Sequence, residues 1–471
     1  MKIFKPIIIY LSIVLLFSNC TNTPEKSITE TPTISPDSPN IIFILTDDQR
    51  WDAIGYASNP IIYTPEMDRM AEQGCYFDNA FVTTPICAAS RASVMTGLYE
   101  RTHRFTFGTP PLKKEYIDHS YPKLLKDAGY KNGFIGKFGM SFQNSLDTTL
   151  FDYYRRPGEQ SFAITYYRLA PNQTSFRHLS TLIADLSIDF LKQYYKQGPF
   201  CLSISFHAPH AEDGDPRQYI WPLEMDTLYQ NIEIPPAVLS EQKYFDEQPE
   251  WVREGFNKAR WYWRFDTEEK YQHSVKGYYR MISGVDHEIG RIRRSLDSLG
   301  IADNTIIMLM GDNGYFLNER LLAGKWLMYE NSLRVPLIVF DPKAEQHGVR
   351  FDEMALNIDI APTILDYAGI TVPEDIQGKS LKNFARKGKA EPDWRDHFIC
   401  EHLFNNPHIP KSEGIRYGRY KYFRYIDHPE YEEFYDLIND PLEIHNLIGE
   451  PSYQDTIKVL RQKFLDDLSL L

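Results

Sequence analysis

Residues 81–98 read FVTTPICAASRASVMTGL, and this stretch predicts a helix that begins near Cys87. Threonine and proline ahead of a run of small residues are signals for helix entry. Cys87 would then lie at a helix N-terminus, where unpaired amide groups and the macrodipole favour anions. Arg91 follows four residues later, so it would share a helix face with Cys87. A nucleophile beside a fixed cation suits attack on a tetrahedral oxyanion. A buried cysteine beside a surface arginine is the alternative that these two residues leave open.

Two apolar runs each lead into a pair of oxygen-bearing side chains. The run 40–45 (NIIFIL) precedes Asp47 and Asp48, and the run 305–310 (TIIMLM) precedes Asp312 and Asn313. Such runs are typical of buried parallel strands, and open α/β sheets place ligands beyond the carboxyl ends of their strands. Adjacent carboxylates repel each other, and oxygen ligands select calcium or magnesium. One pair alone could be a solvated turn, but two pairs at one sheet edge favour a metal site.

Cationic and titratable side chains follow two other strand-like segments. Lys137 comes directly after the segment 133–136, in position to meet an anion. His207 and His210 come directly after the run 200–206 (FCLSISF). Because imidazole titrates near neutrality, these histidines are candidates for proton transfer. A surface lysine and a structural histidine are the ordinary alternatives for each residue taken singly.

Several of these motifs together resemble one enzyme family. PICAASRASVMTGL resembles the maturation and active-site signature of the type I, formylglycine-dependent sulfatases, C-x-P/A-x-R followed by a small-residue helix. TDDQ, CAASR, GK, PH, GDNG, RVPLIV and EFYDLINDPLEIHNL occur in the order of that family, from Asn40 to the C-terminus. The resemblance implies an alkaline-phosphatase-like fold. It also implies that a formylglycine-generating maturation enzyme oxidises Cys87 to formylglycine (3-oxoalanine), whose hydrate attacks sulfur.

The resemblance further implies two sets of site residues. One Ca²⁺ would be bound by Asp47, Asp48, Cys87, Asp312 and Asn313. The sulfate would be surrounded by the catalytic residues Cys87, Arg91, Lys137, His210 and Lys325. The chain departs from the family at Gly139, where many members carry a histidine two residues after the lysine of GK. His207 is the candidate substrate-contacting or acid–base residue that could take over from it.

Hydrophobic periodicity predicts an α/β fold. A large mixed, mostly parallel sheet flanked by helices is expected over residues 40–385 as the catalytic domain. Helices are expected at 64–74, 120–128, 179–196, 278–299 and 357–369, and a further strand at 334–340. From about 386 short alternating segments predict an antiparallel sheet, and a final helix is expected at 453–469. Residues 386–471 are therefore predicted to be a small C-terminal subdomain.

The N-terminus predicts export. Lys2 and Lys5 precede an apolar stretch at 7–17 that is too short to span a bilayer, and Cys20 closes it. This pattern resembles a bacterial lipobox, so residues 1–19 are predicted to be a lipoprotein signal peptide. Cys20 is the predicted lipidation site, with simple secretion as the alternative. Residues 20–39 are then predicted to be a flexible tether, and the protein is expected in the cell envelope, attached to a membrane by its lipid.

Composition and charge bear on the partners. The net charge of −13 comes without a basic run, which argues against nucleic acid, so an anionic substrate needs local positive charge. Aromatic residues make up 14 % of the chain, which suits stacking on sugar rings. The long segment 211–277, with its four tryptophans, is the expected sugar-facing wall. The predicted substrate is a sulfated poly- or oligosaccharide, for example an algal one such as ulvan.

Two other function classes are alternatives that the full set of motifs argues against. A phosphoesterase or phosphonate hydrolase could share this fold and this metal-binding edge, although a two-metal phosphatase would need more His and Asp ligands. A non-catalytic glycan-binding surface lipoprotein would keep Cys87 unmodified.

Overall fold

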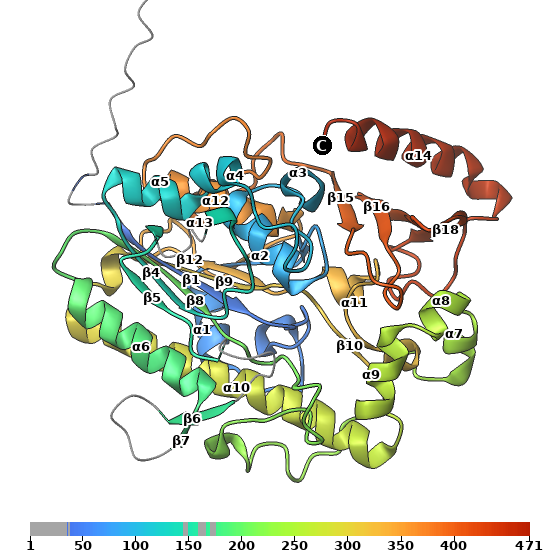
Figure 1. The fold of residues 1–471 in the computed structure, drawn as a ribbon, viewed down its shortest axis with the longest axis horizontal. Helices are drawn as coiled ribbons and strands as arrows, with labels where there is room; N and C mark the ends of the chain where they lie inside the picture. The colour runs from blue at the N-terminus through green and yellow to red at the C-terminus, as the bar shows by residue number, and fades with distance from the viewer. Residues whose placement is uncertain (1–34, 36–37, 145–148, 159–165, 170–175) are drawn as a thin grey trace, which may run out of the picture. The chain divides into compact units, whose positions relative to one another are not determined.

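A computed structural model shows the fold (Figure 1). It describes residue 35 and residues 38–144, 149–158, 166–169 and 176–471. The predicted signal peptide 1–19, Cys20 and most of the predicted tether lie outside the described residues. All described residues belong to one compact unit, residues 33–471. No helix within the described ranges combines the length and the apolarity that a membrane span requires.

An eight-stranded sheet lies at the centre of this unit. Its strands are, in order across the sheet, β13 (Val349–Phe351), β2 (Cys75–Phe77), β12 (Leu337–Phe340), β9 (Thr305–Gly311), β1 (Asn40–Thr46), β8 (Phe200–Ser205), β4 (Lys131–Gly136) and β5 (Tyr153–Arg155). β12 runs antiparallel to both of its neighbours, and the other neighbouring pairs are parallel. The predicted mixed, mostly parallel sheet is confirmed.

Both faces of the sheet are buried. Side chains alternate along a strand, so Ile41, Phe43 and Leu45 of β1 join one apolar cluster, and Ile42 and Ile44 join the other. Helices cover each face (Figure 1). The first face packs against α2 (Cys87–Thr96), α5 (Tyr121–Ala128), α12 (Ile360–Tyr367) and α13 (Lys382–Lys387). The second packs against α1 (Pro65–Gln73), α6 (Leu179–Tyr194) and α10 (Glu268–Leu299).

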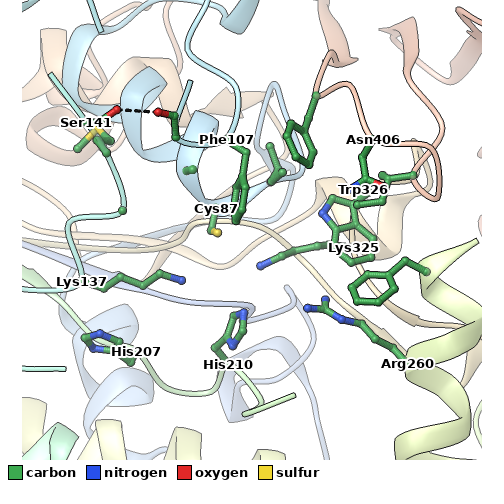
Figure 2. Close-up of a pocket in the computed structure, with 18 of the residues that line it drawn as sticks. Cys87, Phe107, Lys137, Ser141, His207, His210, Arg260, Lys325, Trp326 and Asn406 are labelled. Carbon is green, nitrogen blue, oxygen red and sulfur yellow. Dashed lines mark hydrogen bonds between the residues drawn. The ribbon is translucent and has the colours of Figure 1, made fainter. Parts of the chain in front are cut away.

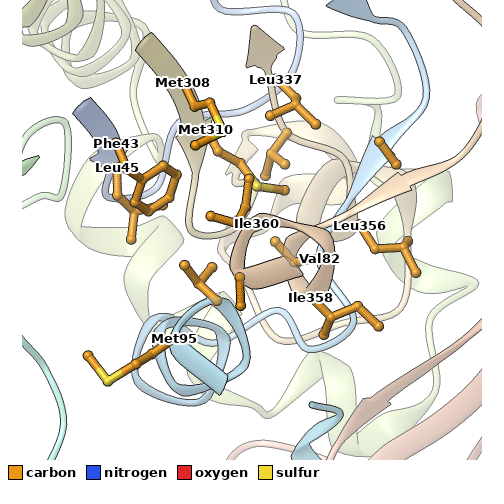
Figure 3. Packing of buried hydrophobic residues seen from close by; sticks show 14 of the residues in the cluster. Phe43, Leu45, Val82, Met95, Met308, Met310, Leu337, Leu356, Ile358 and Ile360 are labelled. Carbon is orange, nitrogen blue, oxygen red and sulfur yellow. The ribbon is translucent and has the colours of Figure 1, made fainter. Parts of the chain in front are cut away.

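Packing on the first face fixes the position of α2. Figure 3 shows Phe43 and Leu45 of β1 and Met308 and Met310 of β9 in the same cluster as Met95 of α2. All ten residues of α2 are buried, so it is enclosed on every side. Each large apolar side chain buried here stabilises the fold by about 1.5–3 kcal/mol. The first turn of α2, where Cys87 lies, is therefore held rigidly over the edge of the sheet.

The C-terminal part forms its own antiparallel sheet. Its strands follow one another as β15 (His397–His402), β16 (Ser412–Tyr417), β17 (Tyr420–Tyr425) and β18 (His428–Asp436). The helix α14 (Gln454–Leu468) packs on it through Ile457, Leu460 and Phe464. This sheet and helix were predicted, and the domain boundary at 385/386 stays a prediction.

Smaller elements complete the unit. The short helices are α3 (Glu100–His103), α4 (Lys114–Asp118), α7 (Gln242–Asp246), α8 (Glu250–Arg253), α9 (Phe256–Arg264) and α11 (Glu330–Leu333). The short strands are β3 (Ala80–Phe81), β6 (Tyr167–Leu169), β7 (Phe176–His178), β10 (Phe316–Leu317), β11 (Ala323–Gly324) and β14 (Ala355–Leu356).

One helix boundary was predicted wrongly. The helix expected at 278–299 begins ten residues earlier, at Glu268. Its true start is marked by Thr267, whose side chain accepts a hydrogen bond from the Lys270 amide at 3.2 Å. A threonine in this position satisfies one of the unpaired amides of the first turn. The segment 211–277 is therefore partly helical and contains α7, α8, α9 and the start of α10.

Candidate active site

Parallel strands bring the predicted site residues to one edge of the sheet. In the register of the sheet, Thr46 pairs with Gly311, Leu45 with Ser205, and Gly136 with Ser205. The carboxyl ends of β1, β9, β8 and β4 are therefore level. The residues that follow these ends are Asp47, Asp48, Asp312, Asn313, His207, His210 and Lys137.

Cys87 is the first residue of α2, as the helix-entry signals predicted. It is 5 % exposed and faces a cavity of about 720 Å³. Asn357 holds the entry segment: its Oδ1 accepts from the Thr83 amide at 3.1 Å, and its Nδ2 donates to Ser90 Oγ at 3.0 Å. Figure 2 shows the Cys87 sulfur between the ammonium ends of Lys137 and Lys325, which approach from opposite sides.

Four acidic and amide side chains form a buried cluster beneath Cys87. Asp47, Asp48, Asp312 and Asn313 are each at most 1 % exposed. Asn313 Nδ2 donates to Asp48 Oδ1 at 2.7 Å, and the Asp48 amide donates to Asp312 Oδ1 at 3.1 Å. Burial and the neighbouring Asp47 carboxylate raise the pKa of Asp312 to about 6. The pairs expected from the sequence thus lie together.

The backbone of Asp48 adopts a rare conformation. Its φ is +67°, in the left-handed region that costs a non-glycine residue about 1–2 kcal/mol. The Tyr278 hydroxyl of α10 donates to the Asp48 carbonyl at 2.7 Å and accepts from the Arg50 amide at 3.0 Å. These bonds hold the strained turn, which directs both carboxylates into the cluster.

Arg91 connects the carboxylate cluster to the surrounding loops. Its Nε and Nη2 donate to Asp312 Oδ2 at 3.0 and 2.7 Å. Its Nη1 donates to the Lys137 carbonyl at 2.8 Å and to the Ser205 hydroxyl. Arg91 is only 3 % exposed, so the alternative of a surface arginine is wrong.

Two lysines complete the ring of cations. Lys137 Nζ donates to Asp47 Oδ2, and Lys325 Nζ donates to Asp48 Oδ1 at 2.5 Å. Burial raises the pKa of Asp47, but the surrounding cations, led by Lys137, outweigh it and hold that pKa well below its ordinary value. Burial likewise lowers the pKa of Lys325, but the Asp48 carboxylate outweighs it, so that pKa is raised. Both lysines stay charged and line the cavity.

The two histidines line the same cavity in different settings. His210 Nδ1 donates to the Ala211 carbonyl at 2.6 Å, and its Nε2 lies 3.7 Å from Asp48 Oδ2. Burial lowers the pKa of His210 to about 4. Both ring nitrogens of His207 are buried without a hydrogen-bond partner among the described residues. Burial, with Lys137 nearby, holds the pKa of His207 well below its ordinary value.

Gly139 fits closely against Arg91. Its φ is +69°, and a Cβ at this position would lie 3.1 Å from Arg91 Cδ. A side chain there would need both a left-handed backbone and a shift of Arg91.

The donor set fits a hard divalent cation. Ligand atoms of Asp47, Cys87 and Asp312 lie within 4.8 Å of one another, as do those of Asp47, Asp48 and His210. Asp47 Oδ1 and Asn313 Oδ1 are buried and accept no hydrogen bond from the described residues. Leaving such oxygens unpaired is costly, and carboxylate and amide oxygens are the ligands that Ca²⁺ prefers.

Several lining residues of the cavity carried no signal in the sequence. Aromatic side chains from separate segments surround its mouth, and polar groups lie among them (Figure 2). These residues are Phe107, Phe256, Arg260, Trp326, Phe404 and Asn406. Trp326 could have been found because it directly follows Lys325. The others lie in segments without a motif, and only the fold brings them together.

The segment 211–277 contributes to the cavity wall, whereas its contact with a sugar stays a prediction. The segment supplies Phe256 and Arg260 to the cavity, but none of its four tryptophans. Trp221 packs against His273 in a tilted arrangement, and Trp251 stacks on His428 at 3.6 Å between ring centroids. Trp261 donates to Asn318 and Trp263 packs on Phe256. Aromatic content alone did not distinguish packing from ligand contact.

The comparison with known families agrees with this site. The model of the sulfatase family matches residues 39–370, well over half of the chain. The chain belongs to the sulfatase family. It is a sulfuric ester hydrolase, and the resemblance seen in the motifs is confirmed. A second model, the C-terminal region of N-sulphoglucosamine sulphohydrolase, matches residues 318–469 of this sulfatase.

Curated relatives extend over almost the whole sulfatase. An N-acetylglucosamine-6-O-sulfatase of Bacteroides thetaiotaomicron is 29 % identical over 95 % of this chain and 88 % of its own. An arylsulfatase of Clostridium perfringens is 27 % identical over 91 % of this chain and 94 % of its own. An ulvan-active sulfatase of Formosa agariphila is 26 % identical over 96 % of this chain and 84 % of its own.

Solved structures agree on the fold. One, a complex with its substrate D-glucosamine-2-N,6-O-disulfate, has a TM-score of 0.78 at 28 % identity, covering 92 % of this chain and 98 % of that chain. A phosphonate monoester hydrolase of Agrobacterium radiobacter has a TM-score of 0.73 at 22 % identity, covering 91 % and 95 %. At that identity the likeness shows the fold alone.

Proposed function

We propose that this sulfatase removes sulfate from sulfated carbohydrate, using formylglycine formed from Cys87 and one Ca²⁺. The observation that carries the proposal is the position of Cys87, at a helix N-terminus inside a cavity that Lys137 and Lys325 line, with the buried Arg91 hydrogen-bonded to the Lys137 carbonyl. A sulfate monoester is anionic, so these cations supply the local positive charge that the acidic chain as a whole lacks. The aromatic mouth of the cavity suits a sugar ring.

The reaction follows from what each group can do. Formylglycine at position 87 would supply, as its hydrate, a nucleophilic hydroxyl and a second hydroxyl on the same carbon that allows the sulfate to leave. The amides at the start of α2 and the ammonium groups of Lys137 and Lys325 bind the sulfate oxygens and stabilise the charge that develops on them. Arg91 keeps the Lys137 loop and Asp312 in place.

His210 is the proposed proton donor to the leaving alcohol. Its Nδ1 is fixed by the Ala211 carbonyl, so Nε2 is the atom that takes up and releases the proton. An anionic sulfate ester beside the ring raises the lowered pKa of His210. Protonation is therefore coupled to substrate binding.

The proposed metal ligands are Asp47, Asp48, Asp312 and Asn313, together with residue 87. Ca²⁺ supplies a Lewis acid that lowers the negative charge around the nucleophile and the sulfate. Asp47 Oδ1 and Asn313 Oδ1 are buried oxygens of this set that accept no hydrogen bond from the described residues.

A saccharide substrate is supported by the relatives. The similar proteins include an N-acetylglucosamine-6-O-sulfatase, an ulvan-active sulfatase and a structure bound to a disulfated glucosamine. Action on ulvan, maturation by a formylglycine-generating enzyme and anchoring of the protein in the cell envelope through lipid on Cys20 belong to the proposal.

The test is sulfate release by protein produced together with a formylglycine-generating enzyme, in calcium. Substrates are N-acetylglucosamine 6-sulfate, glucosamine 2-N,6-O-disulfate, ulvan oligosaccharides, 4-nitrophenyl sulfate and a phenyl phosphonate ester. Sulfate release that Cys87→Ala abolishes supports the proposal. Faster hydrolysis of the phosphonate than of every sulfate ester would move the assignment to the phosphonate hydrolases.

A further inference from the structure

Arg260 lies in the active-site cavity but outside the ring that holds the sulfate. It belongs to α9, in the segment 211–277, and lines the cavity together with Lys325 and His210. Figure 2 shows its guanidinium pointing into the cavity, toward the side on which these two residues lie. It is 6 % exposed, so its charge is largely removed from bulk water.

The guanidinium of Arg260 is held in one place. Its Nη2 donates to Asp213 Oδ2 at 2.5 Å. Its guanidinium carbon lies 4.6 Å from the ring centroid of Trp326 and 5.1 Å from that of Phe256, the geometry of cation–π contacts. A side chain fixed on three sides loses little conformational entropy when it binds a ligand.

The charge around Arg260 is not balanced. Asp213 is shared with a second arginine, Arg264, which is 1 % exposed. Among the described residues these two guanidinium groups have one carboxylate as their ion-pair partner, so one positive charge stays uncompensated. The Nε of Arg260 also has no hydrogen-bond partner among the described residues. A buried cation with an unused donor calls for an anionic partner.

The sulfate that is cleaved does not need this partner. In the proposed function Lys137, Lys325 and the amides of the α2 N-terminus already bind it, and Arg91 positions the Lys137 loop. Arg260 reaches the cavity from a different element, α9, and lies against Phe256 and Trp326 of the aromatic mouth.

We propose that Arg260 binds a second anionic group on the sugar, a carboxylate or another sulfate, and that the substrate is an acidic sulfated saccharide. This inference rests on the proposed function. A planar guanidinium that lines the cavity suits such a group because it offers several donors to the oxygens of a carboxylate or sulfate.

The alternative is a purely structural role for Arg260, in which it ties α9 to the loop around Asp213. Arg264 makes the same tie from a position outside the cavity lining. A structural role predicts equal losses for every ligand, whereas recognition predicts a loss that depends on the second anion.

The test measures dissociation constants by calorimetry in calcium, in a Cys87→Ala background that prevents turnover. One pair of ligands is glucosamine 2-N,6-O-disulfate and N-acetylglucosamine 6-sulfate, which differ in a second sulfate. The other pair is glucuronate 2-sulfate and glucose 2-sulfate, which differ in a carboxylate. In at least one of the two pairs, we expect the doubly anionic sugar to bind at least about tenfold more tightly than the singly anionic one. This factor corresponds to one charge-assisted hydrogen bond.

Arg260→Gln should remove this preference, and Arg260→Lys, which keeps the charge but not the planar group, should retain part of it. The matched control is Arg217→Gln, an arginine of the same segment that is exposed and paired with Asp215. It should leave the preference unchanged.

The proposal is overturned if neither pair shows a preference, including the case in which no sugar binds, or if Arg260→Gln keeps the preference. The proposed function is tested separately, by sulfate release from the same four sugars. This assay uses the protein that keeps Cys87 and is produced together with a formylglycine-generating enzyme, in calcium. Binding with the predicted preference but without any release would contradict the proposed function and leave the role of Arg260 intact.

Discussion

Replacing Arg91 with lysine separates its geometry from its charge. Arg91 donates to three acceptors, which are the Asp312 carboxylate, the Lys137 carbonyl and the Ser205 hydroxyl. The lysine side chain is shorter and ends in a single ammonium group. It can keep the hydrogen bond to Asp312 but loses those to the Lys137 carbonyl and the Ser205 hydroxyl. Each buried acceptor left without a partner costs about 1–3 kcal/mol, so the total is about 2–6 kcal/mol.

If this free-energy cost appears as lost stabilisation of the transition state, because the site residues are displaced, kcat/KM for a sulfate ester decreases by about 30-fold to 10⁴-fold. The assay is sulfate release at several substrate concentrations, with urea unfolding of the same samples to show how much of the cost is lost stability. Arg350→Lys is the control, because Arg350 pairs with Asp78 at the surface and such pairs contribute about 0–1 kcal/mol. An Arg91→Lys enzyme within about threefold of wild type in kcat/KM would refute the reasoning.

Four further predictions follow from the same contacts. Cys87→Ser should abolish sulfate release without changing the unfolding midpoint, because a serine cannot supply the second hydroxyl; near-native activity would contradict the formylglycine mechanism. Lys325→Ala and Asp312→Ala should each lower kcat/KM by about 10²-fold or more, since the first removes a cation that binds the sulfate and the second removes a proposed metal ligand that also holds Arg91; matched steady-state kinetics check this. Chelation with EGTA should abolish activity and lower the melting temperature, and added Ca²⁺ should restore both, whereas unchanged activity would rule out the metal. Burial raises the pKa of Asp286 to about 7 from an ordinary 3.8, so the folded state binds a proton that the unfolded state releases. The unfolding free energy of wild type, relative to Asp286→Asn, should therefore decrease as the pH rises from about 3.8 to about 7, by at most about 1.4 kcal/mol per pH unit. A difference that does not change with pH in urea titrations would contradict this prediction.

Much of the site could be predicted because its chemistry sits at strand ends. The runs 40–45 and 305–310 are apolar enough to be buried strands, and the polar residues after them can only lie at the edge of the sheet. The start of α2 was predictable for a similar reason, since Thr-Pro followed by small residues marks a helix entry. Local sequence determined these positions directly.

The wall of the cavity could not be predicted in this way. Arg260 and Phe404 lie far apart in sequence, on elements without a motif, and their approach depends on how α9 and the loop after β15 pack. The segment 211–277 was expected to form the sugar-facing wall, but none of its four tryptophans lines the cavity, and Trp251 stacks on His428. A large aromatic side chain buries area equally well against protein or ligand, so its identity does not reveal its partner.

The measurement that tests the central claim most directly is the mass of the peptide covering residues 81–101, from protein purified out of its native host. The account predicts a peptide in which the CH₂SH group of Cys87 is replaced by CHO, together with sulfate release by the same preparation. An unmodified Cys87 thiol in protein that still releases sulfate would contradict the account.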